Sequence, residues 1–295
     1  MKKSFLLLHL SVLLAGLTGI FGKLISLNEV VLVWFRVCLS FLLLWAGLKT
    51  TGRLLQYTGR ERLRLACSGL LPALHWIFFY GSIKYANVSV GVVCYCLTAF
   101  FTAILGPMLG RKKLSFFELL LSLVTVAGVG LIFHFDTSFR LGILLGIVSS
   151  LFASFYFLTN EVLVKQYDTG MLNYFQMLGA TVGIGIFLPF YLNLFPGARF
   201  IPTAADAGYL LVLALVCTVG MNALIAEALK KLSAFTVNLC MNLEPVYSII
   251  LAILFLNESQ VLHTSFYAGL SLIILSVALQ MLSPVVLRYK RSQRV

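Results

Sequence analysis

The sequence predicts an all-α membrane protein whose ten transmembrane helices form two inverted five-helix repeats. Three observations predict this fold: the chain has few charged residues, it has a series of apolar segments long enough to span a membrane, and loops rich in Lys and Arg alternate along the chain with loops that have few. Of the 295 residues, 60% are hydrophobic and 11% are charged, whereas a soluble domain carries roughly 25% charged residues. Lipid is therefore the expected solvent. The net charge of +12 is interpreted as membrane-orienting, and no nucleic-acid partner is expected.

Ten apolar segments lie between clusters of charged and turn residues, each near the roughly 20 residues that a spanning helix needs. They cover residues 5–22, 30–48, 65–84, 88–108, 115–134, 141–163, 171–194, 207–229, 233–256 and 265–285. The first segment resembles a signal peptide, but no A-x-A-like cleavage site follows it, so we interpret it as the first helix. The longest loop is expected at about residues 49–64. Since irregular backbone cannot face lipid, a helical bundle is predicted.

The number of basic residues distinguishes the two membrane faces of this bundle. With both termini placed in the cytoplasm, the inner segments carry 17 Lys and Arg residues and the outer segments carry four, namely Lys23, Lys84, Arg140 and Arg199. Such an excess on the cytoplasmic side is typical of multi-pass membrane proteins. The distribution predicts cytoplasmic N- and C-termini. The expected location is a bacterial inner membrane.

An internal repeat is indicated by two fixed offsets. An offset of 147 sets Lys84–Val90 against Lys231–Val237, and also pairs His75 with Asn222 and Tyr95 with Asn242. An offset of 138 sets Ser11, Ala15, Thr18 and Gly22 against Ser149, Ala153, Tyr156 and Asn160. In both sets of four the spacing follows one face of a helix.

Two copies of five helices must enter the membrane from opposite sides, because five is odd. We therefore predict a first repeat at residues 1–136, a second at 137–287 and a basic cytoplasmic tail at 288–295. Inverted repeats are a common transporter architecture, with the binding site at their interface near the membrane midplane.

Three short motifs carry a resemblance to a known family. Leu243–Tyr247 (LEPVY) and Leu254–Glu258 (LFLNE) resemble a Pro-containing ninth helix and its Glu-containing end, and Tyr80–Ala86 resembles the end of the third helix. Together with Arg36 in the second helix, they make the chain similar to the EamA family of the drug/metabolite transporter superfamily.

This resemblance implies a ten-helix carrier, often an exporter of amino acids or related metabolites. The first repeat departs from the pattern, because Thr98 stands where the family pattern has Pro and Arg111 where it has Glu.

Polar and aromatic side chains inside the apolar segments are the candidates for a substrate pathway, since intramembrane polar groups tend to face a cavity or another helix. They are His75, Trp76, Phe79, Tyr95, Thr98, Tyr156, Asn160, Asn222, Asn238 and Asn242. The alternative is that these Asn, Thr and Tyr side chains form hydrogen bonds between helices. His75 is either a proton relay or a neutral ring that donates to a backbone carbonyl.

Two charged residues and one proline complete the candidate site. Arg36 and Glu244 fall within apolar segments, so each is expected to be a buried charge, either paired with the other or bonded to separate polar groups. Pro245 removes one backbone donor and should kink the ninth helix. His75 and Glu244 are the candidates for proton coupling.

The motif inventory excludes an ATP-driven pump, because the chain has no G-x-x-x-x-G-K-[ST] motif. It also has no H-E-x-x-H or G-x-S-x-G motif, and its six cysteines lie in apolar stretches without metal-ligand spacing. We therefore predict a secondary transporter, not an enzyme, that works without cofactor or metal by alternating access. Its expected cargo is a small neutral or zwitterionic metabolite. The alternative is a membrane enzyme or a receptor-like protein; transport direction and oligomeric state stay open.

Overall fold

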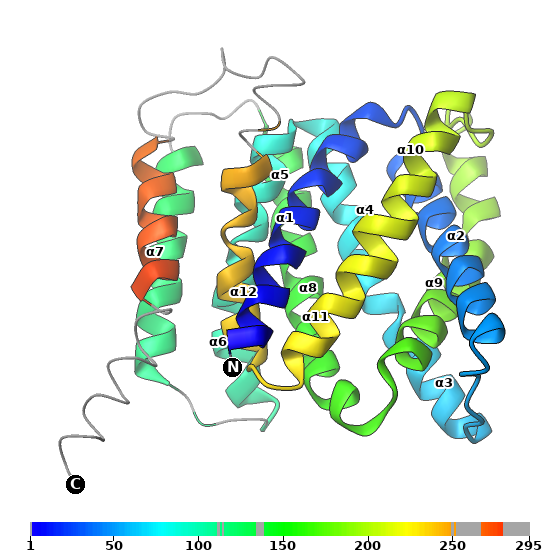
Figure 1. The fold of residues 1–295 in the computed structure, drawn as a ribbon. Helices are drawn as coiled ribbons and strands as arrows, with labels where there is room; N and C mark the ends of the chain where they lie inside the picture. The colour runs from blue at the N-terminus through cyan, green and yellow to red at the C-terminus, as the bar shows by residue number, and fades with distance from the viewer. Residues whose placement is uncertain are drawn as a thin grey trace, which may run out of the picture.

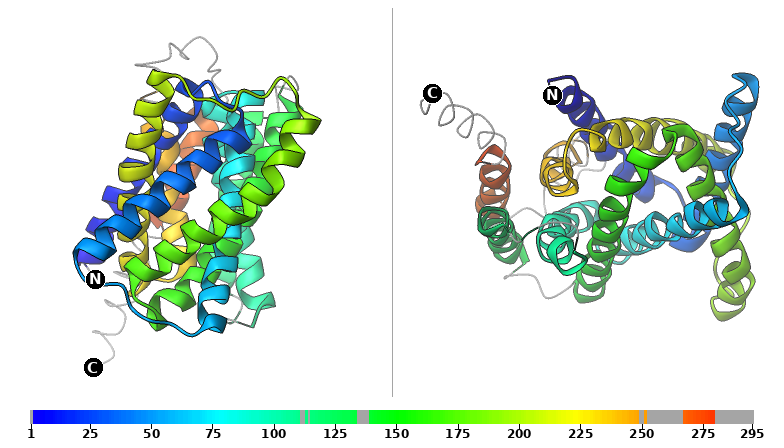
Figure 2. Two further views of the ribbon diagram at one scale, coloured as in Figure 1. Left: turned by 90° about the vertical axis from the view of Figure 1, so that its right-hand side faces the viewer. Right: turned by 90° about the horizontal axis from the view of Figure 1, so that it is seen from below.

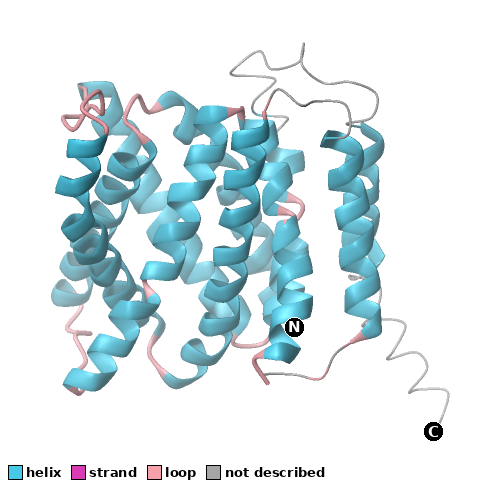
Figure 3. Ribbon diagram, turned by 180° about the vertical axis from the view of Figure 1, so that it is seen from behind, coloured by secondary structure: helices cyan, strands magenta, loops and turns pink. Residues whose placement is uncertain are grey.

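A computed structural model describes residues 2–110, 113, 115–133, 139–248, 251 and 267–279, and all regular elements in these ranges are helices (Figures 1 and 3). They are α1 (Lys2–Leu24), α2 (Glu29–Thr50), α3 (Gly59–Ser68), α4 (Leu70–Tyr85), α5 (Val88–Tyr95), α6 (Leu97–Met108), α7 (Phe116–Phe133), α8 (Arg140–Gln166), α9 (Thr169–Leu194), α10 (Ala204–Ala214), the π-helix η1 (Leu215–Gly220), α11 (Met221–Leu229) and α12 (Ala234–Met241). Residues 244–248 are also helical, and a last helix covers Tyr267–Leu279.

Seven helical segments in the described part of the chain are long and apolar enough to cross a membrane. Three of them join neighbouring elements: Gly59–Tyr85 joins α3 and α4, Val88–Met108 joins α5 and α6, and Ala204–Leu229 joins α10, η1 and α11. The protein is therefore a multi-pass integral membrane protein. The predicted spans 233–256 and 265–285 fall partly, and the predicted tail 288–295 wholly, outside the described residues.

The loop expected at residues 49–64 is shorter than predicted, because α3 begins at Gly59 inside the charged stretch. A capping box starts this helix: the Glu61 amide donates to Thr58 Oγ1 (3.3 Å), and the Thr58 amide donates to Glu61 Oε2 (2.9 Å). These bonds satisfy backbone donors that the first helical turn leaves free. Hydropathy alone misses this start, because the first turns of α3 are polar.

The helices pack in pairs that bring distant parts of the sequence together. The most extensive contacts join α4 to α8, α2 to α9 and α1 to α11. At the periphery α7 stands beside the helix Tyr267–Leu279 (Figure 2), where the hydroxyls of Thr125 and Ser276 lie 2.9 Å apart. These pairs form the main body of the bundle, and α7 lies at its periphery.

Glycines allow α3 and the start of α4 to lie directly against α9. A Cβ atom on Gly69 would lie 1.9 Å from the Gln176 carbonyl oxygen, and one on Gly179 would lie 2.0 Å from the Ala66 carbonyl oxygen. Both contacts would be with backbone, which cannot rotate away. The crossing therefore requires glycine at both positions, as is common where membrane helices approach closely.

Two helical segments are interrupted at their middle. Between α5 and α6 the chain turns at Cys96, and between α12 and the helical residues 244–248 it turns at Asn242 and Leu243. The interruptions touch, since Cys96 Sγ lies 4.0 Å from the Asn242 carbonyl oxygen. Pro245 lies two residues after Leu243, and its missing N–H prevents a regular helix from continuing through this point.

Candidate functional site

A cavity lies in the middle of the bundle, between α1, α4, α5, α8, α11, α12 and the helical turn that begins at Glu244. The cavity is small in this conformation: the space that the centres of water molecules can occupy is about 30 Å³. The lining residues are Ala15, Thr18, Pro72, His75, Trp76, Phe79, Tyr95, Tyr156, Phe157, Met221, Asn222, Ile225, Met241 and Glu244. Aromatic and apolar side chains thus surround a few polar groups, which is the usual composition of a small-molecule site.

Aromatic rings pack around His75 on one wall of the cavity. The ring centroid of His75 lies 5.2 Å from that of Tyr95 and 5.8 Å from that of Phe79. His75 itself is joined to α8, with its Nδ1 atom 2.8 Å from Ser149 Oγ and 3.2 Å from the Ser149 carbonyl oxygen. The contacts hold the imidazole in place between α4 and α8.

The Ser149 contacts also indicate the His75 tautomer. The Ser149 hydroxyl donates to the His75 carbonyl (3.0 Å), so its oxygen accepts from His75 when Nδ1 carries the proton. In a neutral ring Nε2 is then an acceptor. This arrangement is the one expected of a neutral His75 that donates toward a neighbouring helix, and it leaves one acceptor atom for the cavity.

Glu244 is the carboxylate of the cavity. Its side chain is 4% exposed, and no side chain or backbone group of the described residues forms a hydrogen bond or ion pair with it. Burying a carboxylate without a hydrogen-bond donor is costly in free energy. The Glu244 carboxylate therefore needs a donor or a cation that the described part of the protein does not supply.

Arg36 is fully buried and uses its donors on neighbours other than Glu244. Its Nε donates to Thr218 Oγ1 (2.7 Å), Nη1 to the Tyr80 hydroxyl (2.7 Å) and Nη2 to the Cys217 carbonyl (2.9 Å). The guanidinium carbon also lies 3.9 Å from the ring centroid of Trp76, a cation–π contact. Arg36 thus bonds to separate groups and forms no direct ion pair with Glu244, whereas Glu244 bonds to none of the described residues.

The π-helix η1 explains how Arg36 finds an acceptor inside the bundle. In a regular helix most carbonyls are used within the helix, whereas a π-turn changes the local hydrogen-bond register. Here the Cys217 carbonyl in η1 accepts from Arg36, while the Thr218 hydroxyl donates to the Leu213 carbonyl (2.9 Å). Arg36 therefore fastens α2 to the irregular turn between α10 and α11.

Six of the ten predicted pathway residues line the cavity: His75, Trp76, Phe79, Tyr95, Tyr156 and Asn222. The remaining four, Thr98, Asn160, Asn238 and Asn242, are buried outside its lining.

All four form bonds between or within helices. The Thr98 hydroxyl donates to the Tyr95 carbonyl (2.7 Å), and the Asn238 amide donates to Thr102 Oγ1 (2.7 Å). The Asn242 amide nitrogen, in the orientation that satisfies its neighbours, lies 3.3 Å from the Cys96 carbonyl oxygen. For these residues the structure shows the packing alternative.

The fourth, Asn160, belongs to a cluster of buried polar side chains between α3, α8 and α9 that the sequence analysis missed. Gln176 Nε2 donates to Asn160 Oδ1 (2.7 Å) and to Ser68 Oγ (3.1 Å). Asn160 Nδ2, Gln176 Oε1 and Asn173 Oδ1 are buried and have no hydrogen-bond partner among the described residues. The i, i+3 spacing of Asn173 and Gln176 in an apolar segment was the signal that could have revealed it.

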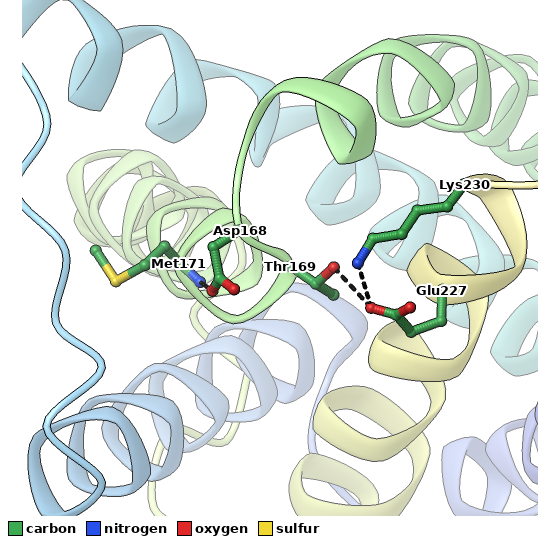
Figure 4. Close-up of polar contacts among 5 residues, drawn as sticks. All are labelled: Asp168, Thr169, Met171, Glu227 and Lys230. Atoms are coloured by element: carbon green, nitrogen blue, oxygen red, sulfur yellow. Dashed lines mark hydrogen bonds and ion pairs between the residues drawn. The ribbon is translucent and has the colours of Figure 1, made fainter.

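Polar contacts join helices at both ends of the bundle. At the end where α1 begins, the lower end in Figure 1, Glu227 on α11 accepts from the Thr169 hydroxyl at the start of α9 (3.1 Å) and pairs with Lys230 (Figure 4). Asp168 caps the same helix start through the Met171 amide (3.0 Å). We call this set the lower tie.

At the opposite end the connection between α1 and α2 is held from two sides. Asp206 at the start of α10 accepts from the Ser26 amide and hydroxyl, both at 2.7 Å. Lys84 at the end of α4 donates to the Ile25 carbonyl (3.0 Å). These contacts, which we call the upper tie, fix the end of α4 and the start of α10 to the same short connection.

Comparison with known proteins agrees with this architecture. The sequence model described as the EamA-like transporter family matches twice, at residues 2–134 and 140–282. A solved structure titled "Crystal structure of protein" is similar in fold with a TM-score of 0.72, at 14% sequence identity over 95% of this chain and 98% of that chain. No curated protein matches.

Proposed function

Because the chain belongs to the EamA-like transporter family, within the drug/metabolite transporter superfamily, we propose that it is a secondary carrier that moves small organic metabolites across the membrane by alternating access. The proposed cargo is an amino acid or a related compound. The proposed direction is export.

The observation that carries the proposal is the position of the cavity between the two family matches. The first match supplies seven lining residues, Ala15, Thr18, Pro72, His75, Trp76, Phe79 and Tyr95, and the second supplies the other seven. A site shared equally by two repeats can be opened toward either face by rocking one repeat against the other. A ligand bound there would contact both moving parts.

Several features support an inverted arrangement of ten helices. The contact of α1 with α11 has its counterpart in the contact of α8 with α4. The interruptions at Cys96 and Leu243 are 147 residues apart, the offset that aligns the two repeats, and the aligned residues His75 and Asn222 both line the cavity. Each agreement relates an element of the first repeat to its predicted equivalent in the second.

We place the lower end of Figure 1 in the cytoplasm of a bacterium. Lys49 and Lys165 lie in the last turns of α2 and α8, Arg60 lies in the first turn of α3, and Arg53 lies between α2 and α3. Basic residues near helix ends favour the cytoplasmic face. In this orientation the lower tie closes the cytoplasmic end and the upper tie closes the outer end. Alternating access would release one tie at a time.

Flux and accessibility measurements test the proposal together. Purified protein in liposomes is expected to exchange at least one member of a panel of labelled amino acids and related metabolites. A Thr18→Cys substitution, made with Cys38 and Cys67 replaced by Ser, places a thiol in the cavity, and an impermeant maleimide should reach it from both membrane faces. The same background without Thr18→Cys is the matched control.

Two results would overturn the carrier. Labelling of the introduced thiol from one face only, under all conditions, would contradict alternating access. Absence of flux for the whole panel would favour the alternative of a membrane enzyme or a receptor-like protein.

A further inference from the structure

We infer that the cavity recognises a protonated amine, and that the Glu244 carboxylate binds the ammonium group of the cargo. The inference rests on the proposed carrier function and narrows its substrate class. It narrows the neutral or zwitterionic cargo expected from the sequence to one that carries an ammonium group, which is placed at a defined residue.

The first argument is the charge of the lining. Glu244 is the one Asp, Glu, Lys or Arg residue among the cavity-lining residues, and it has no hydrogen bond to the described part of the chain. An anion in a water-poor site needs a compensating cation or donor. The open position beside Glu244 therefore favours a ligand that brings positive charge and N–H donors.

The second argument is that Arg36 does not fill this role. Its Nε and both terminal nitrogens donate to Thr218, Tyr80 and the Cys217 carbonyl, and its guanidinium lies against Trp76. Arg36 is therefore engaged outside the lining, and a carboxylate cargo would find no charged donor among the lining residues. The same reasoning disfavours an anionic cargo.

The third argument concerns the kind of cation. Within the described residues no group of three His, Cys, Asp or Glu side chains could hold a metal ion, so a bare metal cation would lack ligands. Aromatic faces instead stabilise organic ammonium groups, and Trp76, Tyr95 and Tyr156 line this cavity. His75 Nε2, an acceptor in the neutral ring, adds a second site for an N–H donor.

Trp76 offers a direct readout, because it lines the cavity. The chain has three Trp residues, so replacing Trp34 and Trp45 by Phe leaves Trp76 as the reporter. Three probes share one ring and differ in charge: benzylamine is a cation at neutral pH, benzyl alcohol is neutral and benzoate is an anion. Titration of the purified protein with each probe measures binding without requiring transport.

Benzylamine is expected to change Trp76 fluorescence saturably, and the other two probes only weakly. Glu244→Gln should weaken benzylamine binding by about thirtyfold or more, since removing one partner of a buried charge pair is costly. Glu161→Gln, which changes a carboxylate of α8 outside the lining, should leave binding unchanged. Circular dichroism and size-exclusion profiles establish that each variant is folded.

Retained benzylamine affinity in Glu244→Gln would overturn the inference, because glutamine imitates a protonated, uncharged Glu244. Equal binding of benzyl alcohol and benzylamine would overturn it as well. Flux of metabolites that carry no amine would refute the ammonium site but leave the carrier intact. Benzylamine binding without flux of any solute would refute the carrier but leave the site.

Discussion

Replacing Arg36 by Lys tests whether a buried guanidinium fastens α2 to the π-helix η1. Arg36 donates three hydrogen bonds, at 2.7, 2.7 and 2.9 Å, to Thr218, Tyr80 and the Cys217 carbonyl. A lysine ammonium is a point charge on a flexible stem and cannot reproduce this planar fork. It should keep one of the three bonds at most and lose the stacking on Trp76.

The expected cost follows from the bonds lost. A hydrogen bond to a charged group contributes about 1.5–3 kcal/mol, so losing two should reduce the free energy of unfolding by about 3–6 kcal/mol. For a chain of this size the melting temperature should fall by about 6 °C or more.

Thermal denaturation of the detergent-solubilised protein, followed by intrinsic fluorescence and by the amount that remains monodisperse, measures the change. Arg140→Lys is the matched control, because Arg140 is exposed at the start of α8. A melting temperature for Arg36→Lys within about 2 °C of the wild type would show that the guanidinium geometry is not required, and the role assigned to Arg36 would be wrong.

Gly179→Ala should lower the free energy of unfolding by about 1–3 kcal/mol or more, because the new Cβ would lie 2.0 Å from the Ala66 carbonyl oxygen. Gly47→Ala is the control: nothing lies within 4 Å of its Cβ, so it should have the melting temperature of the wild type. Equal melting temperatures of the two variants would contradict the close contact between α3 and α9. Asp206→Ala removes the acceptor of the upper tie and should increase maleimide labelling of Thr18→Cys from the outer face. Glu227→Ala should increase labelling from the cytoplasmic face, and unchanged labelling in both variants would show that the ties do not govern access.

Hydropathy predicted the helices well where lipid contact determines the sequence. In α1, α2, α8 and α9 the apolar segment and the helix nearly coincide, because side chains that face lipid must be apolar along the whole span. The prediction was less complete at α3, since a capping box rather than hydropathy starts that helix at Gly59. Polar first turns outside the hydrocarbon leave no signal in a search for apolar segments.

The candidate site was predictable in part, because helical spacing identifies a face but not what the face meets. His75 and Asn222 were expected in the pathway and do line the cavity, whereas Asn238 lies on a similar stripe and donates to Thr102 instead. The π-helix η1 and the acceptor that it provides for Arg36 depend on tertiary packing. Spacing rules for regular helices therefore could not predict that Arg36 is satisfied without Glu244.

The carboxylate of the cavity stands on one wall only, since the position 147 residues before Glu244 is Leu97. The duplicated halves are thus chemically unequal where they face each other. An amine docked against Glu244 would stay attached to the second half while the first half slides past its hydrocarbon end. The cargo would then keep the same orientation relative to the second half throughout transport. Cargo molecules that differ only at the end away from the amine would be discriminated weakly.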